Sequence, residues 1–239
     1  KFSLRGSYLY CHCGAWASCP SPSASAMLKA SENLTVGANY RSEIVLSAED
    51  GDATFENIPN SPLTPFSDTT FSADLPLPAE LTMGLSYKHN DFLFAFDYNR
   101  AMWSVYKALN VDFLNPDGTI RNSSNNARNY QNSSTYRLGT QYVANDKFTF
   151  RAGWYFDESP VQDGYFAPET PRNDSMGYTG GLTYKVNSKL GVDFSFLYLH
   201  FDEVDNSYNH YQENGNTLPF GGTYKSVVFS PGVGITYGF

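Results

Sequence analysis

The sequence predicts an all-β protein, a transmembrane antiparallel up-and-down β-barrel, and three observations support this fold class. Many segments alternate between apolar residues and polar or small ones, which is the period of a β-strand. Aromatic residues make up 16% of the chain, yet its mean hydropathy is -0.41. No run of about eighteen apolar residues occurs, which excludes a helical membrane protein. Alternating membrane strands produce this combination, because each lipid-facing residue neighbours a residue that faces the lumen.

The last segment, residues 223–239, shows the alternation most clearly. From Val227 to Tyr237 every second residue is apolar or aromatic, whereas the intervening residues are mostly Gly, Ser and Thr. A strand of a soluble sandwich would share this alternation. It seldom ends the chain on an aromatic residue such as Phe239 with a tyrosine two places before it, whereas aromatic girdles are typical of transmembrane strands.

Length and charge narrow the possible functions. At 239 residues, one all-β domain is the economical expectation. A net charge of -8 argues against nucleic acid as a partner, since nucleic-acid-binding surfaces are basic. The chain opens at Lys1 without an initiator Met or an apolar leader, so we expect any secretory signal to have been removed or omitted.

Residues 1–33 are expected to be an irregular amino-terminal segment with partial strands, because prolines and cysteines interrupt the alternation there. Cys11, Cys13 and Cys19 are odd in number and cannot build a disulfide framework alone. A zinc site can be imagined around them with His12, but the spacing C-x-C-x5-C is not a usual zinc pattern. We therefore assign no metal, and a loop is the preferred interpretation.

The connections between the later strands alternate in length. Short polar turns are expected near residues 31–33, 89–91, 144–146 and 187–188, and long connections at residues 50–78, 111–129, 159–174 and 203–222. Outer-membrane barrels have short periplasmic turns and long extracellular loops. Residues 34–239 are therefore predicted to be a barrel portion in the cell outer membrane, in contact with lipid and lipopolysaccharide. Phe239 is expected to be recognised by the barrel-assembly machinery.

A short repeat supports the predicted register. The pattern G-x-x-Y ends several strands that run toward the short turns, with its tyrosines at Tyr87, Tyr142, Tyr184 and Tyr237. These side chains would lie at one height around the barrel, as an interfacial girdle does. Each glycine of the repeat falls on the opposite parity and is expected to face the lumen.

Several segments together resemble a known family. They are DLPLPAELTMGLSYK at residues 74–88, YRLG at 136–139, NDKFTFRAGW at 145–154, FDESPV at 156–161 and PRND at 171–174. In these segments the chain resembles the FadL/TodX (OmpP1) family of outer-membrane transporters of hydrophobic compounds, over roughly residues 31–239.

The resemblance implies a barrel of about fourteen strands with an amino-terminal hatch in its lumen. It also implies uptake of long-chain fatty acids or aromatic hydrocarbons. This sequence shows about nine or ten strands, so we expect it to be the carboxy-terminal part of such a protein. It departs from the family pattern at residues 10–23, where a regular strand would be expected.

Two groups of residues are candidates for contact with a solute. Arg137 and Arg151 fall on the lumen parity, where they could steer a carboxylate or belong to a polar network that stiffens the barrel. Apolar residues within the polar connections could form an external groove for a hydrophobic solute, or could pack those connections onto the rim. They are Phe66, Phe71, Leu114, Tyr165, Phe166, Leu218 and Phe220.

Three classes of function remain to be compared. Passive uptake through the barrel needs no cofactor and no catalytic residue, and the sequence contains no P-loop, G-x-S-x-G or H-E-x-x-H motif. A barrel hydrolase is disfavoured, because Ser195 and His200 fall on opposite faces of one strand. The alternative to transport is a barrel that acts as a receptor, an adhesin or a partner in a secretion complex.

Overall fold

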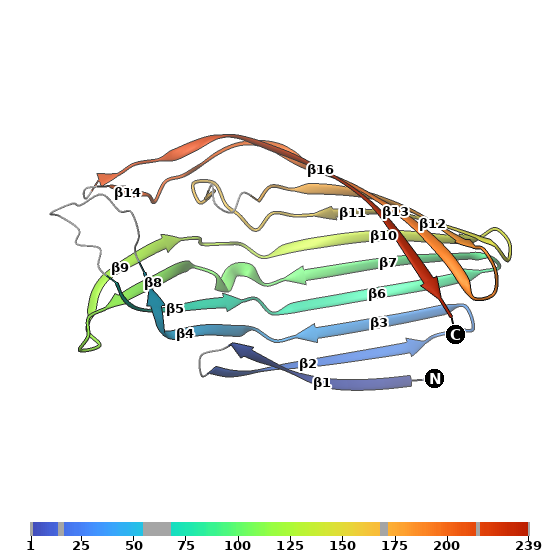
Figure 1. Ribbon diagram of the computed structural model, residues 1–239, viewed down its shortest axis with the longest axis horizontal. Coiled ribbons are helices and arrows are strands. Elements are labelled where there is room, and N and C mark those ends of the chain that lie inside the picture. The colour runs from blue at the N-terminus through green and yellow to red at the C-terminus, as the bar shows by residue number, and fades with distance from the viewer. Residues whose placement is uncertain (1, 14–16, 55–67, 168–171, 214–215, 239) are drawn as a thin grey trace.

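The computed structural model describes residues 2–13, 17–54, 68–167, 172–213 and 216–238. Its main element is a ten-stranded antiparallel sheet in the order β1-β2-β3-β6-β7-β10-β11-β12-β13-β16 (Figure 1). The strands of this sheet are β1 (Phe2–Cys13), β2 (Ala17–Lys29), β3 (Leu34–Arg41), β6 (Glu80–His89), β7 (Phe92–Ala101), β10 (Ser133–Val143), β11 (Phe148–Asp157), β12 (Ser175–Lys185), β13 (Leu190–Tyr208) and β16 (Phe220–Tyr237). The predicted all-β barrel wall is confirmed. No helix among the described residues is long and apolar enough to cross a membrane.

One face of this sheet is apolar and exposed. The register places Phe96 between Leu85 and Leu138, and the same row continues through aromatic residues as far as Phe229. Leu138 is 51% exposed and Val233 is 72% exposed, so no second sheet covers these side chains. In a soluble protein such a face would be buried, whereas a barrel presents it to lipid.

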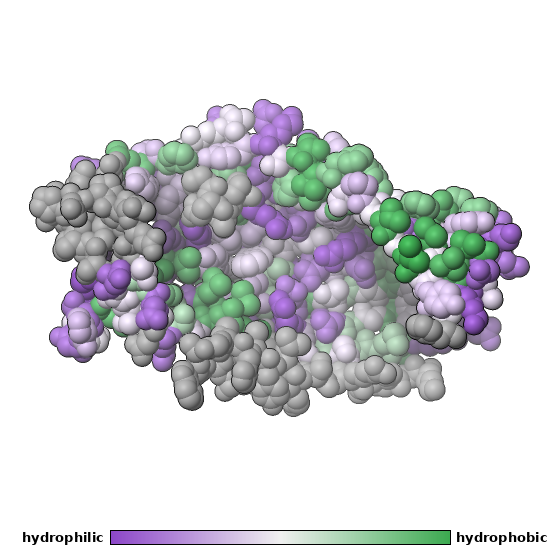
Figure 2. All heavy atoms as spheres, viewed as in Figure 1, coloured by the Kyte–Doolittle hydropathy of each residue, from purple (hydrophilic) through white to green (hydrophobic). Residues whose placement is uncertain are grey.

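The opposite face is polar and is lined by many small residues. Gly84, Asp97, Arg137, Tyr155 and Gly177 follow one another along a single row across five strands. Figure 2 shows hydrophilic surface in the hollow middle of the molecule, and hydrophobic surface at the end where a turn joins β12 to β13 and where β16 ends. We call this concave polar face the lumen wall and the apolar face the outer face.

The short turns all lie at one end of the sheet, together with the carboxy terminus (Figure 1). Side chains stabilise these turns: Asn145 Oδ1 accepts the amide of Phe148 at 3.0 Å, and Asn187 Oδ1 accepts that of Leu190 at 2.9 Å. Tyr142 stacks on Phe92 with ring centroids 4.5 Å apart, and Tyr184 lies 5.0 Å from Phe148. The tyrosines of the repeat thus lie beside the short turns, where an interfacial girdle is expected.

Three of the predicted long connections, at residues 50–78, 111–129 and 203–222, contain strands. β4 (Ile44–Ala53), β5 (Thr69–Leu77), β8 (Ala108–Leu114) and β9 (Ile120–Ala127) form a four-stranded sheet in that order, at the end opposite to the short turns (Figure 1). The sequence pattern did not predict β5, because prolines interrupt the alternation in this part of the chain. The last β5 residue that pairs with β8 is Ala73, and Pro76 lies beyond it. The missing N–H of Pro76 therefore removes no hydrogen bond from the ladder between β5 and β8. A 3-10 helix, η1 (Trp103–Val105), joins β7 to β8, and β14 (Gln212–Glu213) pairs with β15 (Asn216–Thr217).

The amino-terminal segment also differs from the expected irregular chain with partial strands. β1 and β2 pair continuously, with Cys11 opposite Cys19 in the backbone register. Main-chain groups alone make this ladder, so the weak side-chain alternation gave no signal of it. The side chains of residues 1–21, including the cysteines, lie outside the part that the structure describes.

Candidate functional site

The lumen wall is built from pairs in which a glycine makes room for the side chain opposite it. Tyr155 on β11 lies over Gly177 on β12, where a Cβ would collide with the ring. Asp97 lies in the same way over Gly84. Because these side chains lie against the neighbouring strand, they do not project fully into the lumen. The pairs Thr179 over Gly153 and Ser195 over Gly232 repeat the arrangement.

Arg151 is held in a polar network near the short-turn end of the lumen wall. Its Nε donates to Gln141 Oε1 at 2.9 Å and its Nη1 donates to Thr183 Oγ1 at 2.7 Å. The Thr183 hydroxyl in turn donates to Asp193, which also accepts from Thr236 Oγ1 at 3.4 Å. The network joins strands from β10 to β16, as the stiffening interpretation of the inward charges requires.

Arg137 has a different environment. It is exposed on the lumen wall, between Asp97 and Tyr155 in the register. Among the described residues it makes no hydrogen bond or ion pair. It lines a depression of about 540 Å³ together with Asp97, Arg151 and Asp193, and with several small residues. Its guanidinium is thus available on a polar surface that carries charges of both signs.

A second depression of about 580 Å³ lies on the lumen wall over β2, β3, β6 and β7. Ser25, Asn39, Thr82 and Ser86 line it, and it shares Asp97 with the depression around Arg137. Both volumes fall in the range of about 300–1,000 Å³ that is typical of small-molecule sites. Together they form a continuous inner surface on which glycine, alanine, serine and threonine residues are frequent.

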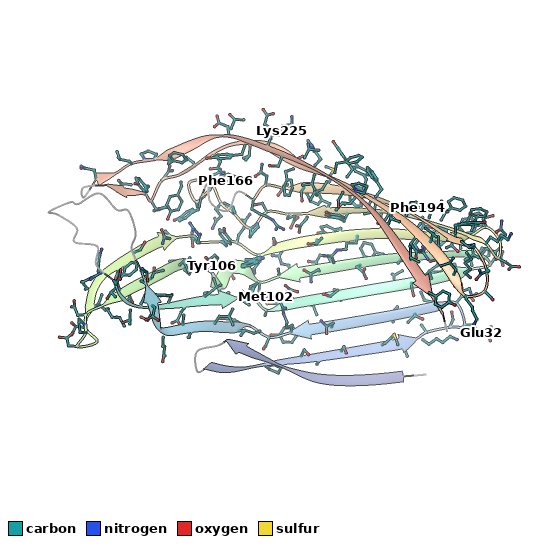
Figure 3. The ribbon with its side chains drawn as sticks, in the orientation of Figure 1. Glu32, Met102, Tyr106, Phe166, Phe194 and Lys225 are labelled. Atoms are coloured by element: carbon teal, nitrogen blue, oxygen red, sulfur yellow. The ribbon has the colours of Figure 1, made fainter. Side chains whose placement is uncertain are left out.

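At the end of the sheet opposite to the short turns, the connection between β11 and β12 folds back onto β13 and β16. Phe166 is 2% exposed, its amide donates to Ser207 O at 3.0 Å, and its ring lies 4.7 Å from that of Tyr224. Arg128, from the connection before β10, lies over the Tyr208 ring at 5.6 Å. We call Arg128, Phe166, Tyr208 and Tyr224 the rim core; Figure 3 shows Phe166 in this place, beside the β13–β16 pair.

Polar contacts fasten this connection at its base. Asp157 accepts from Thr135 Oγ1 at 2.6 Å and pairs with Arg172. The amide of Ser159 donates to Asp174 Oδ1 at 2.6 Å, and the amide of Ser134 donates to Glu158 Oε2 at 2.9 Å. The acidic residues at the outer ends of β11 and β12 therefore hold the segment that carries Phe166.

The predicted solute-contacting residues fall in four places. Phe66 lies outside the described residues, whereas Phe71 and Leu114 are half-buried in the four-stranded sheet. Tyr165 stacks on His210 at 4.4 Å beside Phe166 of the rim core. Arg137 and Arg151 lie on the lumen wall. Leu218 and Phe220 are exposed at the outer tip of the last hairpin, at 43% and 55%.

Sequence reasoning missed two features of this region. Tyr155 carried no signal until the register showed Gly177 opposite it. Trp103, Tyr106 and Tyr130 form a cluster of rings with centroids 5.2 to 6.2 Å apart, where β7 leads into β8. Their spacing in the sequence follows no strand period, because η1 and the connection before β10 turn the chain there.

The residues of the proposed hydrolase alternative do not meet. Ser195 lies on the lumen wall over Gly232, whereas His200 is on the opposite face, 3.7 Å from Asp202. No group of three or more His, Cys, Asp or Glu residues suited to a metal ion occurs in the described part of the chain.

Comparison with known sequences gives a family match. Residues 18–239 match the family model described as outer membrane protein transport protein (OMPP1/FadL/TodX). The chain is 29% identical over 187 residues to Outer membrane protein P1 of Haemophilus influenzae, covering 76% of this chain and 39% of that protein. It is 26% identical over 205 residues to the Long-chain fatty acid transport protein of Escherichia coli, covering 81% and 45%. The chain thus spans less than half the length of these relatives.

Comparison with solved structures supports the fold. The crystal structure of a Pseudomonas aeruginosa FadL homologue matches 92% of this chain and 52% of that chain, with a TM-score of 0.74 and 20% identity. The Ralstonia pickettii toluene transporter TbuX matches 92% of this chain and 48% of that chain, with a TM-score of 0.53 and 19% identity.

Proposed function

Because the chain belongs to the OMPP1/FadL/TodX family of outer-membrane transport proteins, we propose that it is the carboxy-terminal part of a barrel that takes up hydrophobic compounds by passive diffusion. The family consists of transport proteins and not of enzymes. Relatives named for long-chain fatty acids and for toluene indicate the two chemical classes to compare.

The solute that we propose is a long-chain fatty acid, and the exposed guanidinium of Arg137 is the observation that supports it. A fatty acid has an anionic carboxylate that needs a hydrogen-bonding partner in the lumen. An aromatic hydrocarbon has no charged group and needs no such partner. Arg137 can offer a charge-assisted, two-pronged hydrogen bond to a carboxylate. Arg151 already donates to Gln141 and Thr183, whereas Arg137 has no such partner among the described residues, so we assign the carboxylate to Arg137.

Capture is proposed to begin at the outer tip. Leu218 and Phe220 are exposed there, and Tyr211 beside them is 50% exposed. Exposed apolar groups that gather on a surface commonly mark a binding site. From this tip a solute would enter the lumen and then reach the bilayer, where its apolar chain leaves water.

The test uses the full-length protein in cells that lack other uptake proteins for these compounds. Arg137→Gln removes the charge at similar size, and Arg137→Lys restores it. We expect Arg137→Gln to slow oleate uptake by about tenfold, because a hydrogen bond to a charged group contributes about 1.5–3 kcal/mol. Toluene uptake should stay unchanged, and Arg137→Lys should recover part of the oleate rate. Lys189→Gln, in a short turn, is the matched control.

An unchanged oleate rate in Arg137→Gln would remove the proposed role of Arg137. Passage of neither oleate nor toluene through the full-length protein would contradict transport altogether. In that case the exposed tip of Tyr211, Leu218 and Phe220 would favour the alternative function, a receptor, adhesin or secretion-complex partner. A pull-down with the tip residues replaced by Ser would then identify the surface involved.

Contacts with the membrane complete the proposal. Lipid and lipopolysaccharide surround the outer face. The barrel-assembly machinery is proposed to recognise Phe239, which lies outside the described residues.

A further inference from the structure

The outer face carries a groove at β2, β3, β6 and β7. It has a volume of about 360 Å³, within the range of small-molecule sites. We call it the outer groove; besides the backbone at Gly37 and Gly84, its main lining side chains are Ala26, Leu28, Val36, Ala38, Met83 and Phe96. Among the residues that the structure describes, none of the side chains lining it is polar or charged.

The register shows that the groove faces lipid. Leu28, Val36 and Phe96 belong to one row that passes through Leu85, and this row continues into Leu138 and the exposed rings of the outer face. Met83, Leu85 and Leu28 are between 43% and 46% exposed.

The depth of the groove follows from the same register. Leu85 lies two residues from Tyr87, which belongs to the girdle at the short-turn end. Ala26 and Ala38 form the next row, farther from that end. In outer-membrane barrels the short turns are periplasmic, so the groove lies among the acyl chains of the periplasmic leaflet.

Two small residues create the groove. Ala26 and Ala38 are direct partners on β2 and β3, and they form its floor. Farther along the same sheet, the outer-face rows carry Tyr98 opposite Tyr136, and Trp154 opposite Tyr178. The outer face is therefore hollowed here, where alanines stand in place of large side chains and larger apolar groups flank them.

A backbone-thin wall separates the groove from the lumen. The outer groove and the lumen depression of about 580 Å³ share Gly37 and Gly84, together with Ala26, Val36, Ala38 and Leu85. Ser25, Asn39 and Asp97 line only the lumen side. The two faces thus offer different chemistry at one place, and a polar head would find partners in the lumen but none in the groove.

We propose that the outer groove binds one acyl chain of a phospholipid from the periplasmic leaflet. If the groove were empty, the atoms that line it would lack dispersion contacts on one side. A flexible hydrocarbon chain in the groove supplies these contacts. Because the described lining groups are apolar, the groove fits the hydrocarbon part of a lipid. The polar headgroup would remain at the membrane–water interface. This site goes beyond the proposed function, since it concerns the outer face and not the path of the solute.

The test measures lipid retained by the full-length protein. The protein is reconstituted in vesicles of dioleoyl phosphatidylethanolamine, extracted into mild detergent and weighed by native mass spectrometry. Ala38→Leu fills the floor of the groove from β3, and Ala26→Leu fills it from β2. Ala24→Leu is the matched control, because Ala24 lies on the same face of β2 but outside the groove. Heat-modifiable gel mobility reports folding of each variant.

We expect one phospholipid on the unmodified protein and on Ala24→Leu, and about tenfold lower occupancy in either groove variant, because the larger side chain occupies the space of the acyl chain. Equal occupancy in all four proteins would overturn the proposal. Displacement of the phospholipid by oleate would assign the groove to the transported solute, and a lipid-free dimer would assign it to a second copy of the chain; both outcomes also overturn it. Oleate uptake by Ala38→Leu should remain normal, so the result is independent of the lumen site.

Discussion

The ring of Tyr155 lies across Gly177, its direct partner on the neighbouring strand, on the face that lines the lumen. A side chain at Gly177 would push the ring away from the wall and into the path that we propose for the solute. The pair therefore holds the ring against the lumen wall beside Arg137.

We predict that Gly177→Ala lowers stability by about 1–3 kcal/mol, the usual cost of inserting a methyl group into a packed site. It should also slow oleate uptake, because the displaced ring narrows the lumen. Gly180→Ala is the matched control on the same strand, since nothing lies within 4 Å of a Cβ there. Urea unfolding and uptake rates measure the two effects.

A double variant tests whether the ring is the cause. Tyr155→Ala removes the group that the new methyl meets, so Gly177→Ala should cost little in that background. Additive losses in the double variant would show that the two residues act independently.

The alternation of large and small residues was sufficient to predict the sheet and its two faces. Phe96 and Phe229 lie on the outer face as their parity requires, and the short turns lie at one end. The register could not be read from parity, because it depends on which residues of two strands pair. For that reason Arg137 and Arg151 were equivalent in the sequence, and only their neighbours distinguish them.

The connections were harder to predict for a related reason. β4 and β5 contain Gly51 and Pro76, which are typical of loops, yet the strands pair because a neighbouring ladder stabilises them. Likewise, Phe166 and Phe220 are both phenylalanines in polar surroundings. Burial of Phe166 depends on Ser207 and Tyr224, which are distant in the sequence.

The polar network around Arg151 predicts a structural role. In Arg151→Met, Gln141 and Thr183 lose their donor, so we expect a loss of about 1–3 kcal/mol in the free energy of unfolding. Oleate uptake per folded molecule should change much less than in Arg137→Gln. Urea titration in detergent, with uptake normalised to folded protein, measures both. A tenfold loss of uptake in Arg151→Met would instead place Arg151 in the solute path.

The turn between β8 and β9 should respond to acid. Hydrogen bonds from the hydroxyl of Thr119, at 2.6 Å, and from its amide, at 3.0 Å, hold the pKa of Asp117 below its ordinary value of 3.8. A carboxyl with a lowered pKa stabilises the turn above its ordinary pKa, and that contribution is lost as the pH falls through the lower value. Gly118, with φ of 81°, completes the turn.

We expect the protection of the Thr119 amide from hydrogen exchange, corrected for intrinsic rates, to decrease as the pH falls below the ordinary range of a carboxyl. Asp117→Ala lacks the acceptor, so its protection should be low and independent of pH. A parallel decrease in both proteins would mean that Asp117 does not control the turn.

Substitutions at Phe166 and Phe220 should have different effects, the first on stability and the second on solute capture. Phe166 is 2% exposed and packs on Tyr224, so Phe166→Ala should lower the free energy of unfolding by about 3–5 kcal/mol, through lost burial and the cavity left behind. Phe220 is 55% exposed, so Phe220→Ala should change stability by less than about 0.5 kcal/mol.

If Phe220 helps to capture the solute, Phe220→Ala should instead slow oleate uptake at low external concentration, where capture limits the rate. At saturation its uptake should approach the normal rate. Unfolding midpoints and concentration-dependent uptake, measured on both variants of the full-length protein, distinguish the two roles. A stable Phe166→Ala protein with impaired capture would place the apolar contact in the rim core and not at the tip.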